Sequence, residues 1–295
     1  MAKQIRKFWL RSPDGDLWPL NGERAVYLTD PAGLGFERDP TFTPLGQGFF
    51  RRIGADEDVQ ANPACTLVFT GPEPYATYQQ LLAWVARAGN VMELVYCPHG
   101  STEYSRGVEL TSIEKGELNA VGWLSCPTVM TALGPWALPQ PTRLEMDAAA
   151  ATAMSFPLVF DSNLVFGPDS ADVMAADIVA AGHVAAGLVF RYTGAAVNPR
   201  IILTGKHSGT RIGVCDVTAT LEDGDTLELS TRYEDSHIYK LPASGGVVDL
   251  VDELDITRNP FMHIPTSEPC TISMEAGSDI TGTATVTIYY YYRSV

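Results

Sequence analysis

The chain has 295 residues, enough for two domains of ordinary size, and 45% of them are hydrophobic and 19% charged, as in a folded globular protein. A formal net charge of −15 argues against binding along a nucleic-acid backbone, which needs a clustered cationic surface. Residues 1–150 carry 12 Lys and Arg against 17 Asp and Glu, a net of −5, while residues 151–295 carry 8 against 18, a net of −10. We therefore predict two folded domains, with the acidity mainly in the second.

The five cysteines are widely spaced and include no C-x-x-C pair. Their odd number and spacing indicate buried thiols. Only Cys97 has a histidine close by, at His99, and one such pair is too few ligands for a zinc site. We expect no metal ion and no cofactor.

The chain begins with the basic segment MAKQIRKFWL, which has no apolar core of the kind found in a secretion signal. No stretch reaches about 18 uncharged apolar residues, the length that a membrane-spanning helix needs. We expect synthesis in the cytoplasm and no membrane insertion.

Short strands and tight turns open the chain. Residues 4–11 alternate as a strand does, and residues 12–15, SPDG, predict a turn in which Gly15 tolerates a positive φ. Asn21-Gly22 is the strongest short-range turn signal in the sequence. A hairpin with a short return arm over residues 17–20 is the expected result.

Residues 45–53, LGQGFFRRI, hold an unusual cluster of side chains. In an extended strand Phe49 and Phe50 point to opposite faces, and Arg51 and Arg52 follow at once. One interpretation is a phenylalanine pair tucked under a loop. The other is a contact between subunits with an arginine rim, because aromatic residues and arginine are enriched at interfaces.

A helix is predicted over Pro74–Ala88, where apolar residues recur at helical spacing and Gly89-Asn90 follows the last turn. A single amphipathic helix among strands must cover a sheet. Residues 91–97, 103–113 and 117–129 are predicted as three successive strands, with a tight turn at Glu114–Gly116. The first domain is thus mainly β with one packed helix.

Residues 134–141, GPWALPQP, contain three prolines and mark the expected boundary between a domain at 1–141 and a domain at 142–295. The pattern leaves helix and strand open for residues 143–153 and again for residues 171–181.

The second domain is organised around residues 187–235, a run of antiparallel strands and turns. Apolar side chains alternate at Leu188, Phe190 and Tyr192, and the chain is expected to turn at Asn198-Pro199 and at residues 222–225, EDGD. This order predicts a β-sandwich.

The closing strand over residues 283–293 carries four consecutive tyrosines. Alternation from Val286 and Ile288 predicts that Tyr290 lies in the core, and that Tyr289 and Tyr291 are the more exposed pair.

The sequence offers no catalytic arrangement that we can recognise. It lacks a G-x-S-x-G nucleophile elbow, and acidic runs such as residues 222–225 and 252–255 are interpreted as solvated surface. We expect a protein that is not an enzyme.

The order of elements resembles a known family. The opening KFWLRSPDGDLWPLNGERAVYLTDPAGLGFE is similar to that of distal tail proteins of long-tailed phages. The later order of Asn198-Pro199, RIILTG, GTRIGV, DTLELST and VTIYY resembles the C-terminal galectin-like, jelly-roll domain of the same proteins.

The resemblance implies a virion structural protein of the tail tip or baseplate: a homo-hexameric ring at the distal end of the tail tube, formed by the N-terminal domain and assembled in the host cytoplasm. It implies as partners the tail tube protein, a tail-associated tip protein and a receptor-binding protein. Phe49, Phe50, Arg51 and Arg52 are then the candidate subunit contact.

A carbohydrate-binding module is the alternative, because galectin-like folds bind sugars through stacking aromatics and neighbouring polar groups. Tyr233, His237 and Tyr239 are the candidate contacts. A glycoside hydrolase is a more distant alternative.

Overall fold

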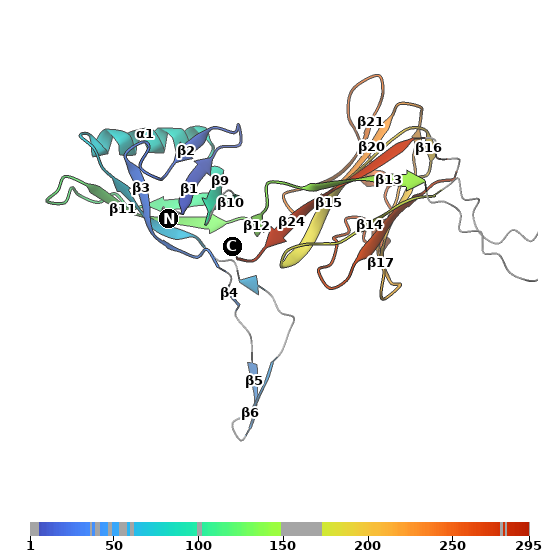
Figure 1. The fold of residues 1–295 in the computed structure, drawn as a ribbon, viewed down its shortest axis with the longest axis horizontal. Coiled ribbons are helices and arrows are strands. Elements are labelled where there is room, and N and C mark those ends of the chain that lie inside the picture. Colours follow the sequence, from blue (N-terminus) through green and yellow to red (C-terminus); the bar gives the residue numbers. More distant parts are fainter. Residues whose placement is uncertain are drawn as a thin grey trace, which may run out of the picture. The chain divides into compact units, whose positions relative to one another are not determined.

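The computed structural model describes residues 6–35, 37–38, 42–46, 49–52, 58–59, 62–98, 102–148, 173–277, 280 and 282–294. For residues 37–59, 147, 148 and 173 within this set, only the backbone is described. The chain divides into two compact units (Figure 1). Unit 1 comprises Met1–Pro139 with Tyr292–Val295, and unit 2 comprises Gln140–Tyr291.

In the residues that the structure describes, unit 1 is mainly β with one helix, as expected. Its elements are β1 (Lys7–Arg11), β2 (Leu17–Pro19), β3 (Val26–Ala32), β4 (Glu37–Arg38), β5 (Phe42–Gly46), β6 (Phe49–Arg52), β7 (Asp58–Val59), β8 (Ala64–Phe69), α1 (Pro74–Arg87), β9 (Val91–Cys97), β10 (Tyr104–Ile113), β11 (Leu124–Ala132) and β12 (Trp136–Ala137).

The main strands of unit 1 pair antiparallel in the order β2–β1–β9–β10–β11–β8–β3. The segment after β2 joins the two ends of this row. The Leu20 N–H donates to the Phe8 carbonyl (3.0 Å), and the Leu28 N–H donates to the Leu20 carbonyl (2.9 Å). The strands therefore form a closed circuit.

The side-chain amide of Asn21 completes this closure, because it forms the two hydrogen bonds that the backbone of a neighbouring strand would form. Its Oδ1 accepts from the Phe8 N–H (2.8 Å), and its Nδ2 donates to the Phe8 carbonyl (2.9 Å). The predicted turn follows directly, with Gly22 at φ +94° and its N–H donating to the Val26 carbonyl (2.8 Å). Asn21 is thus both a turn residue and a strand partner.

Helix α1 has the predicted position and covers one side of the strands of unit 1 (Figure 1). Pro74 stands in its first turn, where its missing N–H costs no hydrogen bond. Tyr78 packs edge-on against Phe69 (5.6 Å between ring centroids), and Trp84 packs against Trp18 (5.9 Å). The core of unit 1 therefore lies between α1 and the sheet.

The predicted turn at Glu114–Gly116 is wrong. The ladder between β10 and β11 continues past it, because the Glu114 N–H donates to the Pro127 carbonyl (2.8 Å). The chain reverses later, at Asn119, whose side chain accepts from the Val121 and Trp123 N–H groups at 3.0 Å each. Gly116 is required for a different reason, since a Cβ there would lie 2.2 Å from the Ser125 carbonyl oxygen.

Unit 2 consists mainly of two large antiparallel sheets, besides one short pair of strands. Its elements are β13 (Thr142–Ala148), β14 (Val173–Ile178), β15 (Val184–Thr193), β16 (Ala196–Val197), β17 (Arg200–Gly205), β18 (Arg211–Asp216), β19 (Thr220–Leu221), β20 (Thr226–Arg232), β21 (Asp235–Leu241), β22 (Val248–Asp249), the 3₁₀ turns η2 (Val251–Glu253) and η3 (Ile256–Arg258), β23 (Cys270–Glu275) and β24 (Thr283–Tyr292). The segments left open between helix and strand, residues 143–153 and 171–181, form β13 and β14 where the structure describes them.

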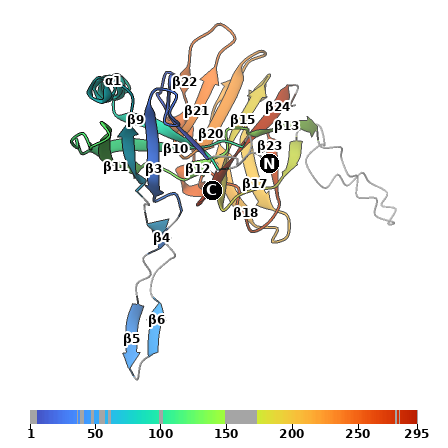
Figure 2. The ribbon, with the colours of Figure 1, turned by 60° about the vertical axis from the view of Figure 1, so that its left-hand side comes forward.

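One sheet has the order β13–β24–β15–β20–β21–β22, and its strands lie side by side in Figure 2. The other has the order β13–β14–β23–β17–β18. Strand β13 belongs to both: residues 142–146 pair with β24, and residues 147–148 pair with β14. It thus connects the two sheets at one corner.

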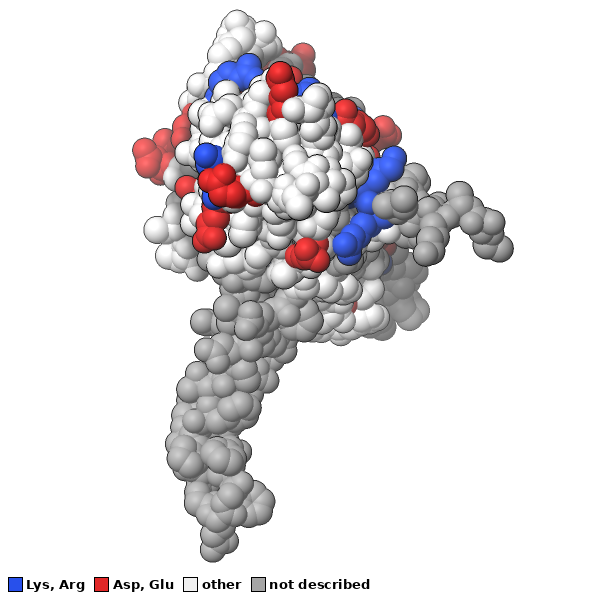
Figure 3. Space-filling view, turned by 90° about the vertical axis from the view of Figure 1, so that its left-hand side faces the viewer, with Lys and Arg blue, Asp and Glu red and all other residues white. Residues whose placement is uncertain are grey.

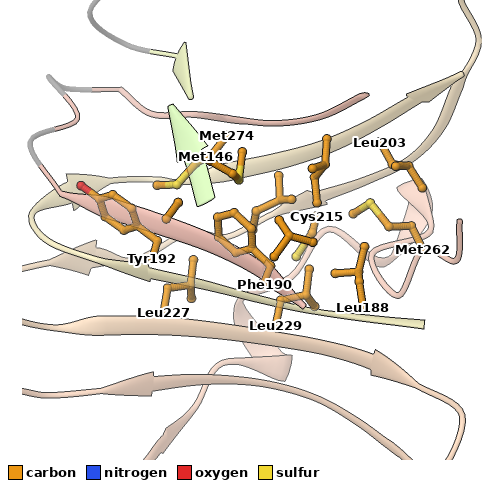
Figure 4. Close-up of a cluster of buried hydrophobic side chains, with 14 of the residues drawn as sticks. Met146, Leu188, Phe190, Tyr192, Leu203, Cys215, Leu227, Leu229, Met262 and Met274 are labelled. Atoms are coloured by element: carbon orange, nitrogen blue, oxygen red, sulfur yellow. The ribbon is translucent and has the colours of Figure 1, made fainter. Parts of the chain in front are cut away.

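The core of unit 2 lies between these sheets. Leu188, Phe190 and Tyr192 of β15 are all fully buried, as their alternation predicts. Figure 4 shows them directed toward side chains of the opposite sheet, among them Leu203 and Met274. All five cysteines are buried, and burial raises the pKa of the Cys65 and Cys215 thiols to about 12.

The predicted orientation of the last tyrosines is wrong. Tyr291 is the buried residue, with 2% of its surface exposed, whereas Tyr290 is half-buried. The register between β15 and β24 shifts between Val184 and Gly187, which pair with Tyr291 and Tyr289. This bulge breaks the simple alternation that the sequence suggests.

The EDGD turn before β20 is held by a buried carboxylate. Asp225 accepts from the N–H of Glu222 (2.9 Å) and of Ala243 (3.0 Å), and it pairs with the Lys240 ammonium group (2.8 Å). The bond from Lys240, followed by those from the two N–H groups, lowers the pKa of Asp225 to about 2. Gly224 supplies the positive φ (+85°) that the turn needs.

We expect unit 2 to lose stability between pH 4 and pH 2 because of Asp225. Its folded pKa of about 2 lies below the usual 3.8, so the unfolded chain takes up the proton first as the pH falls, and about 2 kcal/mol present above pH 4 is lost. Urea unfolding of Asp225→Asn should show lower stability at pH 7 and a smaller decline below pH 4. Asp223→Asn, in the same turn but exposed, is the control, and an equal effect of both variants would contradict this role.

Tyr291→Ala should destabilise unit 2 by about 3–5 kcal/mol, because it removes a large buried aromatic side chain. Its hydroxyl also donates to Glu234 Oε2 (2.8 Å). Tyr290→Ala should cost at least 1 kcal/mol less. Urea unfolding measures both, and an equal or larger cost for Tyr290→Ala would show that the burial described here is incorrect.

Candidate interaction surfaces

The β5–β6 hairpin is the first candidate surface. Phe42 pairs with Arg52 and Pro44 with Phe50, and in the described part of the chain neither strand pairs with a third. A two-stranded ribbon is marginally stable alone, and its open edges offer N–H and C=O groups to another chain. The side chains of Phe49, Phe50, Arg51 and Arg52 lie outside the described residues, so their role as a subunit contact stays a prediction.

A second candidate is the outer face of β8 and β11. These strands have six and nine residues, and none of the residues is charged. The pairing places Tyr27, Val68 and Ser125 in one row across β3, β8 and β11, and Thr29, Thr66 and Pro127 in the next. The side of unit 1 on which α1 and β11 lie in Figure 1 faces the viewer in Figure 3, and its centre is largely uncharged. In so acidic a chain, two adjacent strands without charge are a signal that the sequence analysis overlooked. We call this surface the β8–β11 face.

The tip of the β10–β11 hairpin is a third candidate. It exposes Val121 (72%), Trp123 (45%) and Leu118 (43%) close together in sequence. At its base the Tyr75 hydroxyl donates to Glu117 Oε2 (2.9 Å), which fastens the hairpin to the start of α1. Large exposed apolar side chains grouped in this way are typical of contact surfaces.

The candidate sugar contacts of unit 2 take part in two different sets of ring contacts. Tyr233 stacks on His263 (4.4 Å between ring centroids) and meets Tyr291 edge-on (5.0 Å). His237 and Tyr239 stack on each other (4.3 Å) on one face of β21. The role of these three residues in sugar binding stays a prediction.

The polar groups around His237 are already paired within the chain. Its Nε2 lies 3.0 Å from Glu228 Oε1 and its Nδ1 lies 2.9 Å from Asp235 Oδ1, while Glu228 Oε2 pairs with Arg191. Burial alone would raise the pKa of Glu228, but the bonds from Arg191 and His237 lower it overall. The sequence analysis missed Arg191 and Glu228, although the alternation of Asp235, His237 and Tyr239 along β21 could have indicated a shared outer face.

The described residues hold no group of three or more His, Cys, Asp or Glu side chains placed to bind a metal ion. No described helix is long and apolar enough to cross a membrane.

Comparison with known proteins gives one family match. Residues 7–133, which lie within unit 1, match the family model described as the N-terminal domain of distal tail protein. No curated protein sequence matches the chain.

Solved structures match nearly the whole chain. A chain of the phage p2 baseplate in its activated conformation with Sr gives a TM-score of 0.63 at 13% identity and covers 99% of this chain and 100% of its own. The same baseplate with Ca gives the same values. The SPP1 Dit protein, described as a paradigm of the hub adsorption apparatus in phages that infect Gram-positive hosts, gives 0.63 at 8% identity and covers 96% and 98%. At these identities the likeness is one of fold.

The mainly-β fold, the family match and these structures define a structural component of a phage tail. This result agrees with the sequence resemblance to Dit-like distal tail proteins. Residues 7–133 carry the N-terminal domain of that family.

We expect the full-length chain to give no signal on a glycan array through His237 and Tyr239, because the polar atoms of His237 and Glu228 already have partners. The double variant His237→Ala and Tyr239→Ala should match the unaltered chain. Glycan binding that this double variant abolishes would contradict the expectation and support the carbohydrate-binding alternative.

Proposed function

We propose that this protein forms a homo-hexameric ring at the distal end of a phage tail tube and acts as a non-enzymatic hub. The ring-forming domain is residues 1–141, and residues 142–295 form a galectin-like sandwich. The ring would be assembled in the host cytoplasm and would connect the tube, the tail-associated tip protein and the receptor-binding protein. The observation that carries the proposal is the match of residues 7–133, inside unit 1, to the N-terminal domain of distal tail proteins.

A closed ring of identical subunits requires a head-to-tail contact, in which two different surfaces of one chain meet on neighbouring copies. Unit 1 supports this requirement with surfaces of different chemistry. The β5–β6 hairpin offers unpaired strand edges, and the β8–β11 face offers an exposed sheet surface without charge.

Charge also supports contacts through unit 1. Copies with a net charge of −15 repel one another in general. Contact between copies is therefore favoured where acidic side chains do not face each other, as on the β8–β11 face. An assembly role of this kind depends on interface area and shape rather than on reactive groups.

Electron microscopy of the purified full-length protein in negative stain tests the proposal. We expect ring-shaped particles with six subunits. Particles of single-subunit size at every concentration would overturn the ring.

Replacing Phe50 and Arg52 together by Asp should weaken assembly at least tenfold without unfolding the chain, because it adds two negative charges to the β5–β6 hairpin and removes one positive charge. The matched control replaces Val91 and Arg87 by Asp. This pair is exposed elsewhere on unit 1 and gives the same change in charge. Sedimentation velocity over a dilution series measures assembly. Equal assembly of both double variants would exclude the hairpin from the subunit contact.

A further inference from the structure

Arg106 is a charged residue inside unit 1. It lies in β10 opposite Leu94 of β9, and only 8% of its surface is exposed. Its Nε donates to the Gly134 carbonyl (2.6 Å), and its guanidinium carbon lies 5.8 Å from the centroid of the Trp136 ring. Trp136 is itself fixed, since its Nε1 donates to the Leu34 carbonyl (3.1 Å).

This guanidinium has no counter-ion among the described residues. Its Nη1 is buried without a hydrogen-bond partner, and no carboxylate among the described residues forms an ion pair with Arg106. The more exposed arginines behave differently: Arg11 pairs with Glu93 (2.8 Å) and Arg200 pairs with Asp216. Burial lowers the pKa of Arg106, whereas the bond to Asp216 raises the pKa of Arg200.

A buried charge without a partner is costly, because the hydration that it loses is not replaced. Buried arginines in folded proteins are normally paired with carboxylates. One bond to a carbonyl and an aromatic ring at 5.8 Å leave both N–H groups of the buried Nη1 without an acceptor among the described residues. In the described part of the subunit, the charge of Arg106 therefore lacks a compensating carboxylate.

A carboxylate is the group that completes such a site. It accepts two parallel hydrogen bonds from a guanidinium, and the bonds are strong where water is excluded. The surroundings are aromatic, since Tyr96 packs 6.0 Å from Trp136. The chain has 35 Asp and Glu against 20 Lys and Arg, so each neighbouring copy brings a surplus of carboxylates.

We propose that Arg106 is the receptor for a carboxylate side chain of a second copy of this chain. This inference rests on the proposed ring, and it names one charge pair that would hold neighbouring subunits together. Arg106 belongs to residues 7–133, the part of unit 1 that matches the distal tail N-terminal domain.

The test compares Arg106→Met and Arg106→Lys with the unaltered full-length chain. Sedimentation velocity over a dilution series gives the dissociation constant of the assembly, and fluorescence-detected melting at high dilution gives the Tm of separated subunits. Arg106→Met should raise the dissociation constant at least tenfold while leaving the Tm unchanged or higher, because it removes an uncompensated buried charge. Arg106→Lys, which keeps the charge but not the planar fork, should give an intermediate dissociation constant.

Arg24→Met is the matched control, because Arg24 also stacks on a tryptophan, at 4.5 Å from the Trp18 ring, but is exposed. It should change neither quantity. A subunit that loses Tm with Arg106→Met and assembles normally would show that Arg106 only supports its own fold, and the inference would fail. If Arg106→Met does not fold, a raised dissociation constant of Arg106→Lys with an unchanged Tm supports the charge pair, and assembly equal to that of the unaltered chain overturns it.

The two proposals can fail separately. An unaltered chain that assembles while Arg106→Met assembles equally well overturns the role of Arg106 and leaves the ring intact. An unaltered chain that stays monomeric at every concentration overturns the ring and the Arg106 contact together.

Discussion

Pairing of backbone N–H and C=O groups at strand edges is the constraint on which this structure depends. Unit 1 satisfies it by closing its strands into a circuit, and at the junction the Asn21 side chain bonds both the N–H and the C=O of Phe8, beside the bond from the Leu20 N–H. Unit 2 satisfies it with β13, which pairs with β24 in one sheet and then with β14 in the other. The β5–β6 hairpin is different, because its outer edges have no partner strand among the described residues.

An assembly protein is expected to carry groups that have no binding partner in the isolated subunit and find one on a neighbouring molecule. Among the described residues, the hairpin leaves backbone groups unpaired, Arg106 has no carboxylate partner, and the β8–β11 face leaves an uncharged sheet surface exposed. All three belong to unit 1, which contains the distal tail family match. Unit 2 is more self-contained, since its candidate sugar residue His237 has both ring nitrogens beside carboxylates of its own chain.

Local patterns predicted the elements whose geometry depends on near neighbours in sequence. Asn21-Gly22 forms the expected turn, Pro74–Arg87 forms the expected helix, and the alternation in β15 gives the buried face. The prediction for Tyr290 is wrong because a bulge in β15, on the partner strand, decides which tyrosine turns inward. The tyrosine run alone does not show how β24 pairs with β15.

The candidate sites show the same limit. A run such as FFRR attracts attention in sequence, but nothing in the pattern around Arg106 distinguishes a buried arginine from a solvated one, because its burial depends on Leu34, Gly134 and Trp136, which are remote in sequence. The misplaced turn at Glu114–Gly116 has a related cause. Gly116 is there for a close approach to Ser125 of β11, a contact between strands that a turn signal cannot reveal.

The mass of the intact assembly tests the central claim most directly. Native mass spectrometry of the purified full-length chain should give a species of six times the 31.9 kDa subunit. A single species at the subunit mass, unchanged as the concentration rises, would contradict the ring and with it the interpretation of unit 1 as an assembly domain.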